Sequence, residues 1–171
     1  MNRKISFSIL ILFVILCFPF CSQHSDSYYV SPLGDDTNSG NSPENAWKTI
    51  ERVNGHRFLK GEKVFFQGGE EYHGTILFSP SESGSPEERI LVSSFGEGKA
   101  VINGGNDAGF RADSCHFLTI KNLELKGSGR LAGNTSDGVI VRFSNDILID
   151  SLFVYGFQHS GVHIQNCNNA K

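Results

Sequence analysis

Proline, methionine and tryptophan are scarce in this chain of 171 residues, which contains 5, 1 and 1 of them, respectively. With so few prolines, 39% hydrophobic residues and 19 glycines, the composition is typical of a turn-rich globular chain rather than a disordered one. The chain also lacks a basic run after Lys4 and has a formal net charge of −3. A nucleic-acid-binding function is therefore disfavoured, because such proteins carry a basic footprint.

Long hydrophobic runs are absent except at the start, where residues 5–20 are almost wholly apolar and follow a positively charged segment. This run is shorter than the about 20 residues of a membrane span and fits the core of a signal peptide. Residues 1–21 are therefore predicted to be a signal peptide, with an N-terminal anchor helix as the alternative. Residues 22–171 are predicted to form one domain, since about 150 residues suffice for one.

The residue after this run, Cys21, resembles the lipidated first residue of a bacterial lipoprotein. Phe18 and Phe20 depart from that pattern, because such leaders usually carry small residues there. We expect an exported protein, either periplasmic, secreted or held at the outer membrane surface through Cys21. Membrane contact is expected only through the signal or the lipid.

Cysteine is scarce as well, and the four present divide into two pairs. Cys17 and Cys21 belong to the export segment, which leaves Cys115 and Cys167 for the folded part. Position 144, a serine, lies 29 residues after the first and 23 before the second, so the three positions are predicted to stack on consecutive coils. Two coil spacings amount to roughly 9–10 Å, which is too far for a disulfide. We expect two free, inward-facing thiols; a bulged coil that lets them meet is the alternative.

The strongest positive signal is an internal repeat. Residues 145–156, NDILIDSLFVYG, repeat residues 116–127, HFLTIKNLELKG, with apolar residues and the final glycine aligned. Residues 138–145, GVIVRFSN, recur in the same way at residues 161–168, GVHIQNCN. A period of 20–30 residues built from short apolar strands, glycines and asparagines indicates a β-solenoid.

Helical stretches of 10–15 residues do not separate these strands, which disfavours a doubly wound α/β sheet, and the regular spacing disfavours a β-sandwich. The predicted fold is an all-β, right-handed parallel β-helix with a short N-terminal capping helix. Its expected strands are residues 27–31, 64–66, 76–78, 90–92, 101–102, 118–125, 139–141, 147–154 and 162–164.

The turns of the repeat are expected to have structural roles. Asn122 aligns with Ser151, and Asn145 aligns with Asn168, as asparagines do when they stack at coil turns. Glycines mark corners where φ is expected to be positive, namely Gly127, Gly138, Gly156 and Gly161. Residues 128–137 lengthen one coil and are predicted to form a side loop.

The capping helix is predicted over residues 42–55. Ser42 is a good N-cap, Pro43 suits the first helical position, and Gly55 suits the residue after the end. Trp47, on the same predicted face as Ile50 and Val53, is expected to close one end of the core. Before this helix, Asp35 and Asp36 are interpreted as turn residues, because their spacing is not that of an EF-hand; a calcium site is the alternative.

The opening of the folded part resembles that of secreted bacterial right-handed parallel β-helix proteins of the pectate-lyase-like superfamily. The resemblance lies in residues 28–40, YYVSPLGDDTNSG, followed by AWKTI at residues 46–50. It continues in GEKVFFQGG (61–69), SGSPEERILV (83–92) and GEGKAVING (96–104). The resemblance implies the fold across nearly the whole mature chain. It implies less about the reaction, because members with different substrates share this opening.

The resemblance implies a polysaccharide lyase of pectate, alginate or chondroitin type, acting on uronic-acid glycans; a glycoside hydrolase is a weaker alternative. Such lyases use a cation, often Ca²⁺ held by aspartates, and a basic residue that removes a proton. Asp137 resembles one aspartate of that cluster, but residues 158–163, QHSGVH, stand where related proteins carry further aspartates. The metal cluster is therefore incomplete within the sequence, and Asp137 is its one candidate ligand.

The candidate substrate-binding residues are Arg142, His159 and His163. Arg142 lies between two apolar residues and is expected to point outward, towards an acidic sugar or simply towards solvent. The two histidines flank Gly161, so we expect one in a turn and one in a strand rather than a paired site. Lys121 and Lys126 have the same two interpretations as Arg142.

The chain ends at Lys171 directly after a predicted strand, and an uncovered solenoid edge normally needs a cap. We therefore expect the N-terminal part of a longer β-helix, monomeric, with an incomplete active site. The hypotheses are a polysaccharide-active protein related to uronic-acid lyases, a non-catalytic carbohydrate-binding or adhesive solenoid, and an inactive remnant. Its partner is expected to be an acidic polysaccharide or oligosaccharide.

Overall fold

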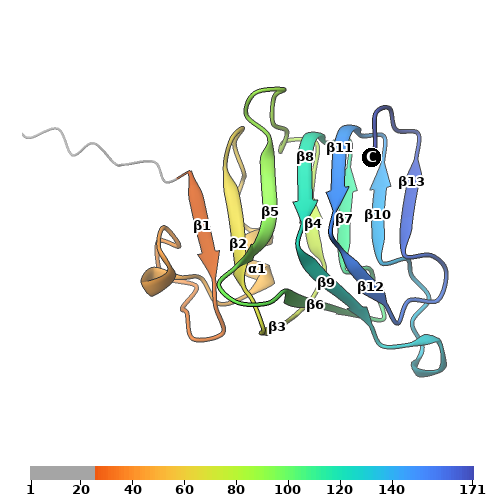
Figure 1. Ribbon diagram of the computed structural model, residues 1–171, viewed down its shortest axis with the longest axis horizontal. Coiled ribbons are helices and arrows are strands. Elements are labelled where there is room, and N and C mark those ends of the chain that lie inside the picture. Colours follow the sequence, from red (N-terminus) through yellow and green to blue (C-terminus); the bar gives the residue numbers. More distant parts are fainter. Residues whose placement is uncertain (1–25) are drawn as a thin grey trace, which may run out of the picture.

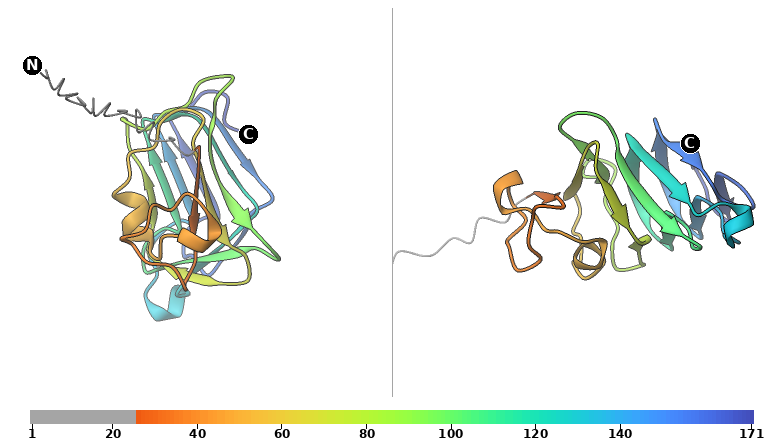
Figure 2. Two further views of the ribbon diagram at one scale, coloured as in Figure 1. Left: turned by 90° about the vertical axis from the view of Figure 1, so that its left-hand side faces the viewer. Right: turned by 90° about the horizontal axis from the view of Figure 1, so that it is seen from below.

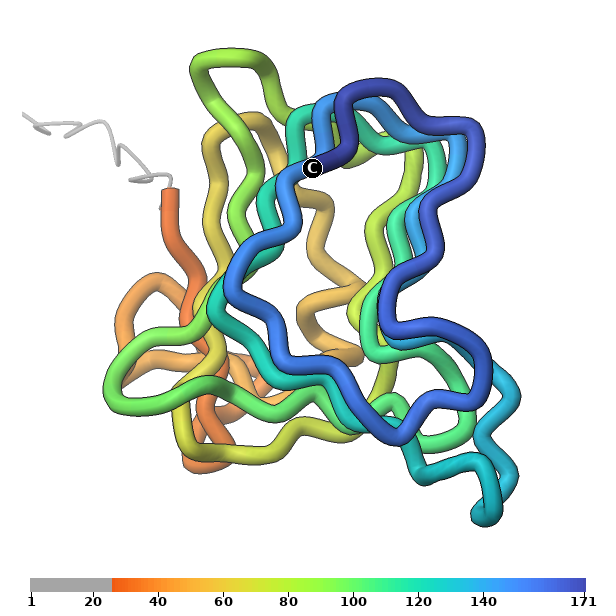
Figure 3. The backbone as a smooth tube through the Cα atoms, turned by 45° about the vertical axis from the view of Figure 1, so that its right-hand side comes forward, coloured from red at the N-terminus to blue at the C-terminus, as the bar shows by residue number. Residues whose placement is uncertain are grey.

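The computed structural model describes residues 26–171, which form a stack of coils with three strands in each complete coil (Figure 1). The predicted signal peptide and Cys21 lie outside the described residues. All strand pairs are parallel, and the strands form three sheets with the orders β1-β2-β5-β8-β11, β4-β7-β10-β13 and β3-β6-β9-β12. Figure 3 shows successive coils of the backbone lying over one another. The predicted parallel β-helix is confirmed.

Each sheet collects one strand from each successive coil. The first sheet contains β1 (Ser27–Val30), β2 (Lys63–Gln67), β5 (Ile90–Phe95), β8 (His116–Lys121) and β11 (Asn145–Asp150). The second contains β4 (Ile76–Phe78), β7 (Phe110–Asp113), β10 (Val139–Arg142) and β13 (Val162–Gln165). The third contains β3 (Glu71–His73), β6 (Ala100–Gly105), β9 (Leu123–Gly127) and β12 (Phe153–Tyr155).

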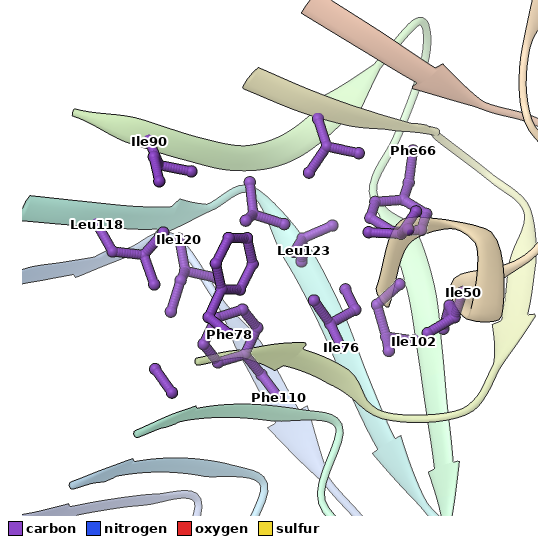
Figure 4. Packing of buried hydrophobic residues seen from close by; sticks show 14 of the residues in the cluster. Ile50, Phe66, Ile76, Phe78, Ile90, Ile102, Phe110, Leu118, Ile120 and Leu123 are labelled. Atoms are coloured by element: carbon purple, nitrogen blue, oxygen red, sulfur yellow. The ribbon is translucent and has the colours of Figure 1, made fainter. Parts of the chain in front are cut away.

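The core is a set of columns in which apolar residues of consecutive coils lie over one another (Figure 4). Ile76, Phe110, Val139 and Val162 form one such column across the second sheet. Phe78 stacks on Phe110 with ring centroids 5.8 Å apart. Alternation along each strand directs these residues inward, and burial of their apolar surface is the main stabilising term. On the last coil, Val162 and Ile164 remain 41% and 44% exposed at inward-facing positions.

The turns repeat as regularly as the strands. Three columns of residues with left-handed backbone (φ from 51° to 56°) follow the repeat, namely Ser114, Phe143 and Asn166; Phe117, Asp146 and Asn169; and Asn122 and Ser151. Asparagine tolerates this conformation better than most residues. The structural role predicted for Asn122 and Ser151 is confirmed: each forms the sharp turn between two strands that the sequence pattern had joined into one.

The prediction of a positive φ was wrong for three of the four glycines. Only Gly156 has a positive φ, of 77°. Gly127 and Gly138 are required instead by close approach between coils, since an added Cβ would lie 2.3 Å from the Gly156 oxygen and 2.2 Å from Val154 Cγ1, respectively. At Gly161 an added Cβ would meet only ordinary contacts of 3.8 Å.

The N-terminal cap differs from the single helix predicted over residues 42–55. Ser42 caps a short 3₁₀ helix, η1 (Pro43–Asn45), and Thr49 caps the separate α1 (Ile50–Asn54). Between them the chain is extended, because Trp47 donates its N–H to Tyr29 and accepts from Ser31. This pairing with the β1 region outweighs the helical pattern of the sequence. Figure 2 shows the cap at the N-terminal end of the coil stack.

Trp47 closes the N-terminal end of the core, as predicted. Its ring is 1% exposed and stacks on Tyr28 with centroids 4.7 Å apart. Ile50 and Val53 of α1 are buried beside it. No helix within residues 26–171 is long and apolar enough to cross a membrane.

The two cysteines of the described chain are free, as predicted. The Cys115 N–H donates to Ser144 Oγ at 3.0 Å, and the Ser144 N–H faces Cys167 Sγ at 3.4 Å. These contacts confirm the column of positions 115, 144 and 167. Burial raises the pKa of the Cys115 thiol to about 12, so this thiol remains protonated at neutral pH.

Candidate functional site

The outer face of the second sheet presents side chains in register across its strands. One row contains Leu77, Arg111, Ile140 and His163. A second row contains Asp113, Arg142 and Gln165. Alternate residues of a strand point to opposite faces, so Arg142 and His163 both lie on this outer face while Val141 lies in the core. The outward orientation predicted for Arg142 is confirmed.

One side of this face is bounded by the loop between β9 and β10, which includes the 3₁₀ helix η2 (Arg130–Ala132). The loop projects from the coil stack, as the blue-green segment in Figure 3 shows. Asn134 anchors it from a fully buried position: its amide donates to the Gly105 oxygen at 2.8 Å. Asn134 Oδ1 accepts from the N–H groups of Ser136 and Gln158. The predicted side loop is therefore tied to the coils on both sides.

Asp137 ends this loop and joins two coils at the edge of the face. Its Oδ1 accepts from the Ser160 N–H at 2.9 Å and from the Ser160 hydroxyl at 2.5 Å. Its Oδ2 lies 3.2 Å from His163 Nδ1. The residue is only 7% exposed. Burial acts to raise the pKa of Asp137, but the hydrogen bonds from Ser160 and His163 outweigh it and hold that pKa below its usual value.

Asp137→Asn is expected to destabilise the protein by about 1–3 kcal/mol at pH 7, because a buried charged acceptor is lost. The folded pKa is lowered, so this stabilisation is complete above the unfolded pKa of about 3.9 and is lost as pH falls through the lower folded value. Urea unfolding of the unmodified protein and of Asp137→Asn, from pH 7 to pH 2, measures this stabilisation. A difference between them that does not shrink in acid would contradict this account.

The cluster of Ser160, Asp137 and His163 is not a nucleophilic triad. Both the serine and the histidine bind the carboxylate, whereas a triad needs the imidazole between the hydroxyl and the carboxylate. With the carboxylate ionised, the His163 Nδ1–H donates to Asp137. That orientation leaves His163 Nε2 without a partner among residues 26–171, as suits a group that hydrogen-bonds a ligand or moves a proton.

Arg142 is the central cation of this face. Arg111 is already paired, with its guanidinium 3.4 Å from Asp107 Oδ1. Arg142 forms no ion pair with any described residue, and its Nε is buried without a hydrogen-bond partner. No acceptor among residues 26–171 therefore fixes this side chain, and leaving its buried N–H unpaired is costly. Its guanidinium can therefore turn towards an anionic group on a ligand.

A cavity of about 420 Å³ continues the face towards the N-terminal end. It is lined by Leu77, Phe78, Ser79, Pro80, Asp107, Arg111 and Asp113. The face thus combines a shallow cavity, a free cation and an Asp–His pair along consecutive strands of one rigid sheet. Such a combination of shape and polar groups is suited to an extended polar ligand.

His159 lies in the exposed turn between two coils, where its backbone N–H donates to the Ser136 oxygen at 3.3 Å. This arrangement, with His159 in a turn and His163 in a strand, is the predicted one.

Three residues of this face, Arg111, Asp113 and Ser160, were not predicted from the sequence. Subtracting 29 from Arg142 reaches Asp113, so extending the repeat by one more coil would have found that residue.

Calcium does not fit Asp137 as the side chain is placed. Both carboxylate oxygens face hydrogen-bond donors, which a cation would have to displace. Within residues 26–171 no group of three or more His, Cys, Asp or Glu side chains is placed to hold a metal ion.

The turn interpretation of Asp35 and Asp36 accounts for all their described contacts. Asp35 Oδ1 accepts from the N–H and hydroxyl of Thr37. Asp36 Oδ1 accepts from the N–H groups of Lys48 and Thr49, and its Oδ2 accepts from the Thr49 hydroxyl. These bonds attach the turn to the residues that start α1.

No protein-family model matches the chain. It is 29% identical over 136 residues to the lacto-N-biosidase of Bifidobacterium longum subsp. longum, a match that covers 75% of this chain and 8% of that protein. The crystal structure of a GH136 lacto-N-biosidase from Eubacterium ramulus aligns with a TM-score of 0.68 and 20% identity, covering 82% of this chain and 30% of that one.

A rhamnogalacturonan lyase aligns with a TM-score of 0.55 and 15% identity, covering 75% of this chain and 37% of the lyase. These two structural matches support the β-helix fold. The chain spans well under half the length of each of these relatives.

Proposed function

We propose that this chain is part of an exported, polysaccharide-active β-helix protein and that the outer face of β4, β7, β10 and β13 contacts an acidic glycan. The observation that carries the proposal is Arg142, an outward-facing and partly exposed cation with no ion-pair partner among residues 26–171. The matched relatives support the glycan class, because they are named lacto-N-biosidase and rhamnogalacturonan lyase.

In this proposal the Arg142 guanidinium pairs with the carboxylate of a uronic-acid unit. That contact withdraws negative charge from the carboxylate and acidifies the adjacent proton, which is what a lyase requires of a cation. His163, oriented by Asp137, presents Nε2 as the group that hydrogen-bonds or removes a proton. In the same proposal His159, which lies in an exposed turn, contacts a longer glycan at the edge of this face.

A non-catalytic carbohydrate-binding or adhesive solenoid is the second candidate. The same Arg142 contact would serve binding alone. Hydrolysis would instead need two carboxylates about 5–9.5 Å apart across a glycosidic bond. Export through residues 1–21, with lipid attachment at Cys21, is part of the proposal and lies outside the described residues.

Ultraviolet absorbance of unsaturated uronides on pectate, alginate and chondroitin, with and without calcium, tests the lyase proposal. Any product formed on one of these substrates should fall at least tenfold in Arg142→Ala, because the carboxylate contact is removed. Arg57→Ala, an exposed arginine in the N-terminal cap, is the matched control and should keep full activity.

The outcomes separate the candidates. Binding of trigalacturonate that depends on Arg142, without any rise in absorbance, would favour the non-catalytic protein over the lyase. Neither binding nor product on any of the three polysaccharides would overturn the proposal.

A further inference from the structure

The outer face of the third sheet carries different side chains from the outer face of the second sheet. Its strands place two rows of side chains in register: Glu71, Val101, Glu124 and Phe153 in one, and His73, Asn103, Lys126 and Tyr155 in the other. Four neighbouring strands at about 4.8 Å spacing make a track roughly 14 Å long, comparable with a short oligosaccharide. In Figure 1 this sheet, β3-β6-β9-β12, runs along the lower side of the molecule.

The charged groups on this face contact one another and the neighbouring polar side chains. Lys126 Nζ lies 3.0 Å from Glu71 Oε2, and the Asn103 amide donates to Glu71 Oε1 at 2.6 Å. The Tyr155 hydroxyl donates to Glu124 Oε1 at 2.6 Å. This contact raises the pKa of Tyr155 to about 12, so the phenol remains a neutral donor. Two carboxylates against one ammonium leave no excess positive charge to attract an acidic ligand.

Two aromatic rings occupy the C-terminal end of the track. Phe153 and Tyr155 are 57% and 38% exposed, and their ring centroids lie 5.2 Å apart. At the opposite end a cavity of about 310 Å³ is lined by Pro32, Lys48, Thr49, Ile50, Glu51, Glu71, Tyr72 and His73. Exposed aromatic faces beside fixed hydrogen-bonding groups match a sugar ring, which has apolar C–H faces and polar hydroxyl edges.

We propose that this face is a second glycan-binding site, specific for an uncharged oligosaccharide and separate from the site around Arg142. Phe153 and Tyr155 stack on the faces of sugar rings, while Glu124, Asn103 and Lys126 hydrogen-bond the hydroxyls. A neutral ligand is favoured because Glu71 and Glu124 would repel a uronate. The inference rests on the proposed glycan-related function but uses none of the same residues.

Isothermal titration calorimetry of the purified protein with lacto-N-tetraose and cellotetraose, two uncharged oligosaccharides, tests it. We expect binding of at least one of them, at least tenfold weaker in Phe153→Ala and unchanged in Arg142→Ala. Leu148→Ala is the matched control, because Leu148 is a comparably exposed apolar residue on the outer face of the first sheet. Unchanged thermal unfolding of Phe153→Ala would show that the loss reflects binding.

A second variant separates ring stacking from hydrogen bonding. Tyr155→Phe keeps the ring and removes only the hydroxyl, so it should weaken binding less than Phe153→Ala. If neither uncharged oligosaccharide binds, or if Phe153→Ala binds as the unmodified protein does, the inference is overturned. Trigalacturonate binding that depends on Arg142 would then still support the proposed function, whereas loss of all glycan binding would overturn both.

Discussion

Replacing Trp47 with alanine is expected to destabilise the protein by about 3–5 kcal/mol, the range for deleting a large buried aromatic side chain. The ring is 1% exposed at the N-terminal end of the core. It stacks on Tyr28, its Nε1–H donates to the Asn38 oxygen at 3.1 Å, and the Arg52 guanidinium lies 4.2 Å from the ring centroid. Alanine would lose all these contacts and leave a cavity that opens the core beneath the cap.

Urea unfolding followed by far-ultraviolet circular dichroism measures this loss. Leu33→Ala is the control, because Leu33 is 95% exposed in the same cap and should change the unfolding free energy by less than about 0.5 kcal/mol. A loss below about 1 kcal/mol in Trp47→Ala would mean that this residue does not close the core.

Gly138→Ala is the second large effect we expect, a loss of about 3 kcal/mol, at the upper end of the usual cost of overpacking. An added Cβ would lie 2.2 Å from Val154 Cγ1 and 2.7 Å from the Gly161 oxygen. That oxygen cannot retreat freely, because it accepts the Val139 N–H at 2.9 Å in the bonding between two coils. The substitution would therefore push apart the coils that Asp137 and Ser160 join.

Gly161→Ala is the matched control, since Gly161 occupies the equivalent position one coil later. Its added Cβ would meet Val154 carbons only at 3.8 Å, and its φ is not positive. Thermal unfolding of both variants should show a large decrease in Tm for the first and a small change for the second. Equal decreases would contradict the idea that coil spacing at Gly138 requires glycine.

The coil repeat could be predicted because equivalent positions in successive solenoid coils have nearly identical surroundings. A residue type that fits inside one coil fits inside the next, so Ile120 and Ile149 recur 29 positions apart and pair in the structure. The same regularity placed Cys115 and Cys167 in one column. Arg142 followed from alternation along a strand, which needs no knowledge of distant contacts.

Features that depend on distant contacts escaped prediction. The helix expected over residues 42–55 is interrupted because Trp47 pairs with the backbone around Val30, a partner the local pattern does not reveal. β3 and β7 were missed because short strands with polar residues, such as Glu71 and Asp113, lack the apolar run of the others. The Asp137–His163 contact joins positions 26 residues apart, and no local spacing identifies it.

Amide chemical-shift mapping by NMR during titration with trigalacturonate is the most direct test of whether a glycan binds the outer face of β4, β7, β10 and β13. We expect the largest shifts in residues 111–113, 137–142 and 160–165, and loss of those shifts in Arg142→Ala. Shifts confined to other parts of the chain, or no shifts at all, would contradict the claim.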